Sequence, residues 1–428
     1  MLRQIYNFTL IPLAIGASPF WILKTKRRGG LSKRLWEKLG RYHEVDLTSM
    51  EGTHPIYVHA ASVGEANIAR KLIARWSSLH PEERFLLGIG TSTGFDLAKQ
   101  SPPANTEVIY APLDLSPVVK SFFASFQPKL VVLIEHEVWP NMVHYACEQG
   151  IPIGLANARL SVRSGKRLER LRPFAGRMYD RLSWVGAQSP EDCPRLEAIG
   201  IRPESLEVSG SVKFDPAFDT PSACSLKPTE LLDSLGEGPI LMALSTHPGE
   251  EILFANAASQ VQGARLVIIP RHMERRNEIQ DELKGAGFET VLRSTIDLVD
   301  SSSFRGMIMV VDTTGEMPAF TKEAQVVFVG KTILAKGGQN PCEAISAKVP
   351  VVAGPWFGNF EPLATQLRSN EGLWTVEDEQ TMAKALQELS DDQEKAQKQA
   401  ANALSTLEAH RGATDRTVEA LAKLVEPE

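Results

Sequence analysis

The sequence is poor in cysteine and lacks the spacings that usually mark metal or nicotinamide sites. Its 428 residues include only four cysteines, which lie far apart without a C-x-x-C pair. A disulfide scaffold and a structural zinc site are therefore not indicated, and a reducing compartment is expected. No H-x-x-x-H spacing accompanies the histidines, and the glycines that follow residue 87 do not form a dinucleotide-binding loop. A metal site and a nicotinamide site are thus not predicted.

An excess of positive charge is also lacking, because the formal net charge is −6. A general nucleic-acid binder is usually strongly basic, so nucleic acid is not an expected partner. The exception is a basic stretch, residues 159–181, in which Glu169 and Asp180 are the only acidic residues. Its basic residues are Arg159, Arg163, Lys166, Arg167, Arg170, Arg172, Arg177 and Arg181. They suggest an anionic partner such as a phosphate or lipid head group, or else a solvated helix face.

Only one segment is long and apolar enough to be considered for a membrane. Residues 4–23 carry no charge, and a helix of that length reaches about 30 Å, the thickness of the hydrocarbon layer. The basic residues that follow, within 24–28, are typical of a signal anchor that leaves the rest of the chain cytoplasmic. Proline, glycine and polar residues dilute the segment, so an interfacial or docked helix stays open. No cleavage site of a removed signal peptide is evident.

Past this segment, apolar runs typical of buried strands alternate with helical patterns. Six runs, from "IYVHA" at residue 56 to "LEVSG" at residue 206, predict a parallel sheet covered by helices on both faces. A polar stretch after Pro216, ending near Pro239, is the expected linker. Six further runs follow, from "PILMAL" to "VPVVAG". The sequence therefore predicts an α/β protein with two doubly wound sheets in tandem.

The expected domain boundaries follow from these patterns. Residues 1–24 form the anchor or interfacial helix, residues 25–225 the first domain and residues 226–428 the second. The tail from residue 391 to 425 is rich in Ala, Leu, Lys and Glu, which indicates helices with a break near Gly412. These helices are expected to belong to the second domain.

The stretch "HAASVGEANIAR" places Glu65 behind a predicted strand and in the first turn of a predicted helix. Ser62 and Glu65 fit the S-x-x-E capping box, in which the two side chains satisfy free backbone N–H groups. A carboxylate just past the carboxyl end of a strand also stands where open α/β sheets bind ligands. Both interpretations stay open at this point.

The stretch "EHEVWPN" places Glu135 and Glu137 directly after another predicted strand. If the strand continued, this spacing would put both carboxylates on one face. Buried carboxylates need basic partners, which Arg159, Arg163 or Lys213 could supply. A purely structural ion-pair network is the alternative.

Similar signals follow the strands of the second half. Arg271 follows a predicted strand, and its guanidinium suits phosphate. The run "GGQNPCE" leads into a helix with Pro341 at its start, where free N–H groups accumulate, and Glu343 could accept hydrogen bonds from a ribose. Taken together these features favour a nucleotide phosphate pocket. His59, His136, His247 and His272 lie at strand ends and are expected to be hydrogen-bonded structural residues rather than metal ligands.

The motifs "HAASVGE", "GTSTG", "EHEVWPN", "NARLSVRS", "GSVKFD", "STHPGEE", "PRH", "GGQNPCE" and "GPWFGNF" occur in an order that resembles the bacterial 3-deoxy-D-manno-octulosonic acid (Kdo) transferases of lipopolysaccharide synthesis. The resemblance implies a GT-B fold with two Rossmann-like domains facing across a cleft. It implies transfer of Kdo from CMP-Kdo to the lipid A precursor, lipid IVA, at the cytoplasmic face of the inner membrane. The acceptor would bind the first domain and the donor the second.

The resemblance also implies roles for individual residues. Glu65 would be the general base of an inverting, metal-independent reaction without a cofactor, and Glu135 and Lys213 would contact the transition state. The expected donor-binding residues are Pro270, Arg271, Thr314, Gly315, Glu316, Asn340, Pro341, Cys342 and Glu343. No metal ligand is implied, because the donor has a single phosphate.

This sequence departs from the family pattern at two places. The family often has two glycines after the "FVG" strand, whereas Lys331 follows Gly330 here. The family's "ETELWPN" is replaced by "EHEVWPN", with His136 and Val138. The alternatives are another GT-B enzyme, either a transferase of a different nucleotide sugar or an epimerase, and a catalytically silent, membrane-tethered lipid-binding protein.

Overall fold

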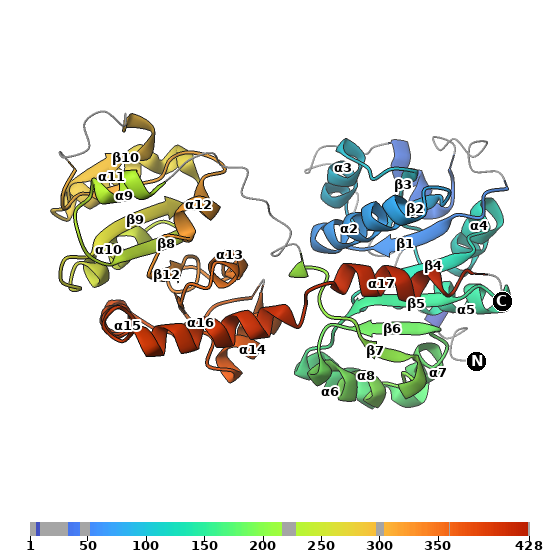
Figure 1. Ribbon diagram of the computed structural model, residues 1–428. Helices are drawn as coiled ribbons and strands as arrows, with labels where there is room; N and C mark the ends of the chain where they lie inside the picture. The colour runs from blue at the N-terminus through green and yellow to red at the C-terminus, as the bar shows by residue number, and fades with distance from the viewer. Residues whose placement is uncertain are drawn as a thin grey trace. The chain divides into compact units, whose positions relative to one another are not determined.

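The computed structural model describes residues 6–8, 33–42, 52–215, 228–296, 304–358 and 360–426. The chain divides into two compact units, one containing residues up to Asp215 together with 412–428 and the other Pro216–Arg411. Each unit contains one seven-stranded sheet, shown in Figure 1. All the strand pairs in both sheets are parallel. The prediction of two doubly wound α/β sheets is therefore confirmed.

The first sheet has the strand order β3-β2-β1-β4-β5-β6-β7. Its strands are β1 Ile56–Ala60, β2 Phe85–Ile89, β3 Thr106–Tyr110, β4 Leu130–Ile134, β5 Ile153–Ala158, β6 Trp184–Ala187 and β7 Leu206–Val208. The sequence predicted all of these except β3. That strand lies at the edge of the sheet and begins with the half-buried Thr106 and Glu107, so its apolar run is short.

Helices cover both faces of the first sheet because successive side chains of a strand point to opposite faces. In β1, Ile56 and Val58 pack with α2 and α3, whereas Tyr57 packs with the aromatic residues of α4. The helices of this unit are α2 Val63–Leu79, α3 Ser92–Gln100, α4 Ser116–Phe126, α5 Pro140–Glu148, α6 Val162–Arg170, α7 Arg172–Tyr179, α8 Cys193–Ala198 and α17 Ala413–Ala422, with the 3-10 helices η1 Lys33–Leu39, η3 Pro190–Asp192 and η4 Pro203–Ser205.

The last helix, α17, was expected in the second domain but packs on the first sheet, beside α2 and β5 (Figure 1). Val418, Leu421 and Ala422 bury their side chains in that core. Position 154 in β5 is glycine, and a Cβ there would lie 2.2 Å from Leu421 Cδ2. The expected boundary at residue 225 and the unbroken second domain 226–428 therefore differ from the observed units. The predicted break near Gly412 is present, and it is the point where the chain returns to the first unit.

The second sheet has the order β10-β11-β9-β8-β12-β13-β14. Its strands are β8 Ile240–Thr246, β9 Arg265–Pro270, β10 Thr290–Leu292, β11 Ile308–Val310, β12 Val326–Val329, β13 Val351–Ala353 and β14 Trp374–Thr375. Its helices are α9 Pro228–Asp233, α10 Glu250–Ala258, α11 Arg276–Gly285, α12 Met317–Thr321, α13 Cys342–Ser346, α14 Glu361–Ser369, α15 Glu379–Asp391 and α16 Gln393–Glu408, with η6 Met273–Arg275 and η7 Arg293–Thr295. Strand β14, which has only two residues, was not predicted from the sequence.

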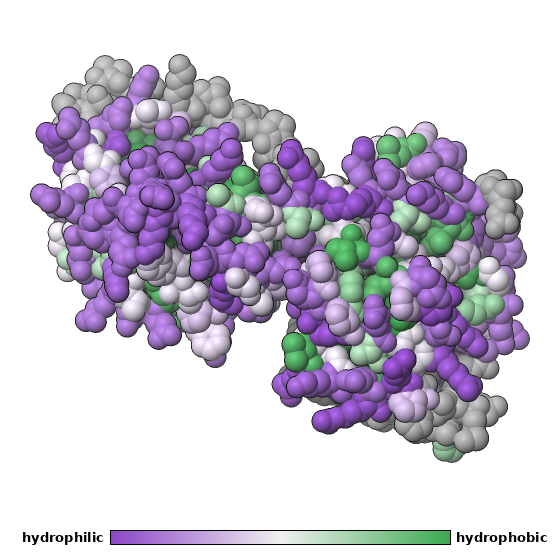
Figure 2. Space-filling model, turned by 60° about the horizontal axis from the view of Figure 1, so that its bottom comes forward, coloured by the Kyte–Doolittle hydropathy of each residue, from purple (hydrophilic) through white to green (hydrophobic). Residues whose placement is uncertain are grey.

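The surface drawn in Figure 2 is mostly hydrophilic, and apolar residues occur there in small separate groups. Within the described ranges, no helix combines the length and apolar character needed to cross a bilayer. Residues 6–8 are helical, and the Asn7 side chain exchanges hydrogen bonds with Asn141 at the start of α5. The rest of the predicted anchor, residues 1–24, lies outside the described residues, so the anchor stays a prediction. The first half of the expected linker, residues 216–227, also lies outside them, and the second half contains the helix α9.

Candidate functional site

Each sheet has a point where the winding direction reverses, and ligands of doubly wound proteins bind there, beyond the carboxyl ends of the strands. In the first unit this switch point lies between β1 and β4, which are adjacent. Glu65 lies in the first turn of α2, directly after β1, and Glu135 is the first residue after β4. The two expected acidic residues therefore flank the switch point from its two sides.

Glu65 is buried, and hydrogen bonds hold both of its carboxylate oxygens. Oε2 accepts from the backbone N–H of Ala61 at 2.6 Å, and Oε1 accepts from the Ser62 hydroxyl at 2.9 Å. Ser62 is the N-cap of α2 and accepts the Glu65 N–H. The arrangement is a variant of the capping box, because the reciprocal bond goes to Ala61 rather than to the cap residue itself. Each oxygen keeps a lone pair for a further donor, so capping and catalysis are compatible.

Glu135 adopts a left-handed backbone conformation with φ of 59°. The strand ends at Ile134 and the chain turns, so the expectation that Glu135 and Glu137 share one strand face is wrong. The Glu137 carboxylate instead accepts a hydrogen bond from Trp139 Nε1 at 2.9 Å. A strained conformation at a ligand-binding edge is a common feature of functional residues.

Burial, reinforced by the charge of Glu65, raises the pKa of Glu135. Arg159, His136 and Lys213 act in the opposite direction and favour the carboxylate. Of the basic partners that the sequence suggested, Arg159 and Lys213 are therefore close enough to act on Glu135. Burial and the charge of Glu65 likewise raise the pKa of Glu137. Three carboxyl groups thus share one region with a small number of cations.

The turn that carries Lys213 follows β7, and Asn157 of β5 holds it. Asn157 Oδ1 accepts hydrogen bonds from the Val212 N–H at 3.1 Å and from the Ser211 hydroxyl at 3.4 Å. Asn157 is fully buried with φ of 57°, so its backbone is also in the left-handed region. The Lys213 side chain is exposed. Asn157 lies within the motif "NARLSVRS", but its role could not be read from the sequence, because it depends on a contact 55 residues away.

Residues 90–94 of the first unit spell G-x-S-x-G, the pattern of a serine nucleophile elbow. Ser92 is the first residue of α3, however, and has no histidine partner among the described residues.

In the basic stretch, α6 is exposed along nearly all of its length. Within the described part of the chain, no carboxylate forms an ion pair with Arg163, Lys166, Arg167 or Arg170.

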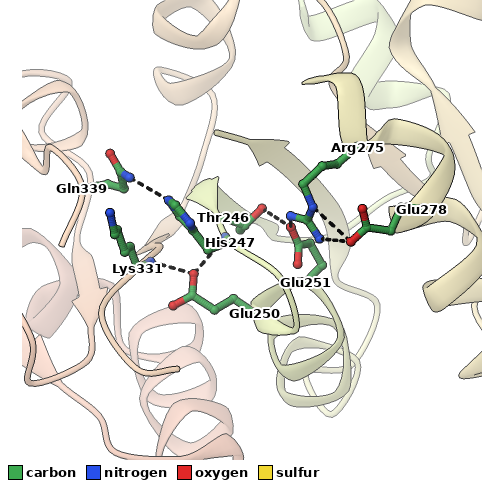
Figure 3. Close-up of polar contacts among 8 residues, drawn as sticks. All are labelled: Thr246, His247, Glu250, Glu251, Arg275, Glu278, Lys331 and Gln339. Carbon is green, nitrogen blue, oxygen red and sulfur yellow. Dashed lines mark hydrogen bonds and ion pairs between the residues drawn. The ribbon is translucent and has the colours of Figure 1, made fainter. Parts of the chain in front are cut away.

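The switch point of the second unit lies between β8 and β12, and Glu250 joins its two sides. This carboxylate is fully buried in the first turn of α10. It accepts backbone N–H groups of His247, which follows β8, at 3.0 Å, and of Lys331, which follows β12, at 2.6 Å. The Thr332 N–H also donates to it at 3.1 Å. Figure 3 shows how Glu250 fixes the two loops to each other.

Cationic side chains surround His247 at this edge of the sheet. The His247 Nε2 and Gln339 Nε2 atoms are 2.9 Å apart, and the His247 and His272 rings are 6.0 Å apart. Burial lowers the pKa of His247, and Lys331, His272, Arg275 and Arg271 lower it further. Arg275 is paired with the buried Glu251 and with Glu278 (Figure 3). A neutral histidine among several cations marks a region suited to an anion.

Pro270 ends β9, and Arg271 follows it with an exposed side chain that makes no hydrogen bond or ion pair with other described residues. The Arg271 N–H donates to the Thr246 carbonyl at the end of β8. Arg271 therefore follows a strand, as predicted, and lies next to the end of β8, whereas its binding of phosphate stays a prediction.

Thr314, Gly315 and Glu316 lie in the turn between β11 and α12. Gly315 has φ of 84°, and the Thr314 hydroxyl contacts the sulfur of Met273. Glu316 forms a two-pronged ion pair with Arg293, with N–O distances of 3.1 Å. This pairing was not predicted, and it gives Glu316 a structural role in addition to the predicted one.

The run of residues 340–343 opens α13. Asn340 Oδ1 accepts the Cys342 N–H at 3.1 Å, and Pro341 and Cys342 are buried. Burial raises the pKa of Glu343, and its Oε2 atom has no hydrogen-bond partner among the described residues. A buried oxygen without a hydrogen-bond partner favours a ligand whose hydroxyl group can donate a hydrogen bond to it.

Of the four histidines that the sequence placed at strand ends, His59 and His247 are hydrogen-bonded, and His136 and His272 are exposed. Within the described ranges, no group of three or more His, Cys, Asp or Glu side chains could hold a metal ion. His59 Nδ1 lies 2.9 Å from the Tyr57 hydroxyl, and burial lowers the pKa of His59 to about 4. His59 is therefore a structural histidine, as predicted.

Comparison with known proteins identifies the family. A sequence model described as 3-deoxy-D-manno-octulosonic-acid transferase (kdotransferase) matches residues 33–216. The 3-deoxy-D-manno-octulosonic acid transferase of Haemophilus influenzae is 30% identical over 404 residues, which covers 92% of each chain. The chain belongs to the Kdo transferase family. The enzyme of the same name from Bordetella pertussis is 32% identical over 384 residues, which is 86% of each chain.

Membership of this family means that the chain is a glycosyltransferase, and the lipid-binding alternative without catalysis is not supported. A putative UDP-N-acetylglucosamine 2-epimerase from Listeria monocytogenes has a similar structure, with a TM-score of 0.53 and 14% identity over 87% of this chain and 96% of the other. At this identity the likeness shows only the fold. It agrees with the GT-B-like α/β fold that the resemblance implied.

Proposed function

We propose that this chain transfers Kdo from CMP-Kdo to a lipid A precursor, lipid IVA, at the cytoplasmic face of the inner membrane. The observation that carries the proposal is the chemistry at the two switch points. The first presents Glu65 and Glu135, and the second presents cations around His247. A carboxylate base on one unit and an anion-binding edge on the other are the groups that sugar transfer from an anionic donor requires.

In the proposed reaction, a sugar hydroxyl of the acceptor attacks the anomeric carbon of Kdo. The bond from that carbon to the phosphate oxygen breaks, CMP leaves with the bonding electrons, and the configuration inverts. Glu65 takes the hydroxyl proton through one of its remaining lone pairs, while Ala61 and Ser62 hold the carboxylate in place. Lys213 offsets negative charge that develops as the reaction proceeds, and Glu135 lies beside Glu65 to orient the reacting groups.

The proposed donor site uses the second unit. Arg271 pairs with the phosphate, and Pro270 and the turn 314–316 line the nucleotide. Asn340, Pro341 and Cys342 shape the start of α13. The unpartnered Oε2 of Glu343 supports a contact with a ribose hydroxyl, because a buried acceptor gains most from a donor that completes its hydrogen bonding.

We propose that no metal or other cofactor takes part. The donor carries one phosphate, so no diphosphate needs to be bridged, and arginine with backbone N–H groups can hold it. Excess EDTA should leave the initial rate nearly unchanged. A loss of activity that Mg²⁺ specifically restores would refute this part of the proposal.

A donor assay tests the proposal against the alternative of another nucleotide sugar. Purified protein with detergent-dispersed lipid IVA is supplied in turn with CMP-Kdo, UDP-glucose and UDP-N-acetylglucosamine, and release of CMP or UDP is measured. We expect acceptor-dependent release of CMP only. Turnover of a UDP-sugar, or CMP release that does not require the lipid, would favour the alternative.

A further inference from the structure

Lys331 occupies a backbone position that suits glycine better than lysine. Its φ is 60°, in the left-handed region, where a side chain is strained. The residue before it, Gly330, packs so closely on the end of β8 that a Cβ would lie 2.5 Å from the Ser245 carbonyl oxygen. At position 331 itself, glycine would adopt the left-handed conformation without this strain. The strain needs another explanation.

The fold holds this strained residue firmly at the switch point. The Lys331 N–H donates to Glu250 at 2.6 Å, and its carbonyl accepts the Gly338 N–H at 2.9 Å. Glu250 is fully buried and also binds the His247 N–H, so the loops after β8 and β12 share one carboxylate. Because the backbone is fixed on both sides, the direction in which the Lys331 side chain leaves the loop is also fixed.

That direction leads to the anion-binding edge. Figure 3 shows the side chains of Lys331, Gln339 and His247 on the same side of the Glu250 carboxylate. Across the described part of the chain, the Lys331 ammonium makes no hydrogen bond or ion pair, whereas Arg275 is neutralised by Glu251 and Glu278. Lys331 and Arg271 are thus the cations near His247 whose charge the described carboxylates leave uncompensated.

We propose that Lys331 is a donor-binding residue whose ammonium pairs with an anionic group of the nucleotide sugar. The inference rests on the proposed function and extends it. Family members with a second glycine after the strand have no side chain at this position that could make the contact. The anionic group is either the phosphate or the sugar carboxylate, and both would lie near a switch point that also presents Arg271. Removal of the ammonium should therefore weaken binding of the donor and leave the chemical step alone.

The chain supplies a matched control in Lys348. This residue has the same φ of 60° and an exposed side chain, but it precedes β13 and so lies at the amino end of the strands. Lys348→Gly removes one lysine charge and the same backbone strain without touching the switch point. Lys331→Asn tolerates the left-handed conformation, and Lys331→Arg keeps the charge.

The experiment measures kcat and KM for CMP-Kdo, the inhibition constant of CMP and the melting temperature of each variant. For Lys331→Gly and Lys331→Asn we expect KM to rise about tenfold at unchanged kcat, the size of one charge-assisted contact. Lys331→Arg should retain most of the affinity, and Lys348→Gly should match the wild type. If the contact is to phosphate, the inhibition constant of CMP rises with KM; if it is to the carboxylate, only KM rises.

Two results would overturn the inference. An unchanged KM in both Lys331→Gly and Lys331→Asn would show that the ammonium does not bind the donor. A fall in melting temperature together with equal losses for Lys331→Arg would show a structural role. Failure of the wild-type protein to turn over CMP-Kdo would instead refute the proposed function, and this inference with it.

Discussion

At the scale of single residues, Glu65 combines a structural and a proposed catalytic role in one side chain. Both of its oxygens accept hydrogen bonds from the turn before α2, so the carboxylate is positioned before any substrate binds. Glu65→Gln keeps the shape but cannot take a proton. We expect turnover to fall by about 10² to 10⁴ while CMP binding is retained, as measured by initial rates and titration calorimetry. If Glu65→Gln keeps nearly the wild-type turnover, Glu65 acts only in capping the helix.

Glu135 leads to a prediction about pH. Burial and the charge of Glu65 raise its pKa in the folded state, so the folded protein binds this proton more tightly than the unfolded chain does. The associated stability is present at low pH and is lost as the pH rises through the raised pKa. Glu135→Gln removes the buried charge, so its melting temperature should exceed that of the wild type at pH 7 and approach it towards pH 4 to 5.

The control for this measurement is Glu82→Gln, since the Glu82 side chain is 68% exposed and its loss should change little at either pH. The same Glu135→Gln variant should lose turnover, because a residue under electrostatic strain at a site is kept for function rather than for stability. If the melting temperature of Glu135→Gln at pH 7 is below that of the wild type, the Glu135 carboxylate does not destabilise the fold as predicted.

The motifs predicted site roles for Glu65, Glu135 and Lys213, which stay predictions, and all three residues follow strands of one sheet at its carboxyl edge. The sequence could not identify Asn157 or Glu250, because each acts through a partner far along the chain. The expected shared face of Glu135 and Glu137 failed for a local reason. The strand ends at Ile134, the last residue of its apolar run, and Glu135 follows in the left-handed region, so the strand does not continue to Glu137.

At the scale of elements, the strands were predictable where their residues are buried on both faces and less so at the edges. β3 begins with half-buried polar residues, and β14 is too short to form a pattern. The helical pattern of α17 was also readable, but its docking on the first sheet was not. That docking depends on the space left by Gly154 and on the Asp215 carboxylate, neither of which is local to the helix.

Asp215 ties the start of α17 to the end of the first part of the chain. Its oxygens accept the N–H groups of Gly412 at 2.6 Å and of Thr414 at 2.8 Å, and the side chain is buried. Asp215→Ala removes two bonds to a charged acceptor and should lower the free energy of unfolding of the first unit by about 2 to 3 kcal/mol. Chemical denaturation followed by tryptophan fluorescence measures this change.

Asp392→Ala is the comparison for that prediction, because Asp392 is an exposed N-cap that accepts one N–H, that of Lys395. Its loss should lower the free energy of unfolding of the second unit, to which Asp392 belongs, by about 1 kcal/mol, the usual value for a cap. If Asp215→Ala lowers the free energy of unfolding no more than Asp392→Ala does, the hydrogen bonds of Asp215 to the start of α17 do not contribute as predicted.

At the scale of the whole molecule, the chain is acidic, but its basic stretch includes the exposed helix α6. Arg167 and Arg170 in α6 have no carboxylate partner among the described residues, so their charge is available to an anionic surface. Reversal of both to Glu should weaken binding to anionic liposomes by at least about 1 kcal/mol per charge. Added salt should shrink the difference through screening. Flotation with and without anionic lipid measures both effects.

The reversal of Lys384 and Lys398 to Glu is the control, because it changes the net charge by the same amount at exposed positions of α15 and α16 in the second unit. It should leave flotation unchanged. If both double variants lose liposome binding equally, net charge alone matters. If the reversal of Arg167 and Arg170 causes no loss of binding, the basic stretch is a solvated helix face.

The central claim is transfer of Kdo from CMP-Kdo to a lipid A precursor, and mass spectrometry of the lipid product tests it most directly. Tetra-acylated precursor is incubated with CMP-Kdo and the protein, with Glu65→Gln in parallel. The account predicts that the precursor gains the mass of one or more Kdo residues with the wild-type protein and almost none with the variant. An unmodified precursor with folded wild-type protein, or equal modification by both proteins, would contradict it.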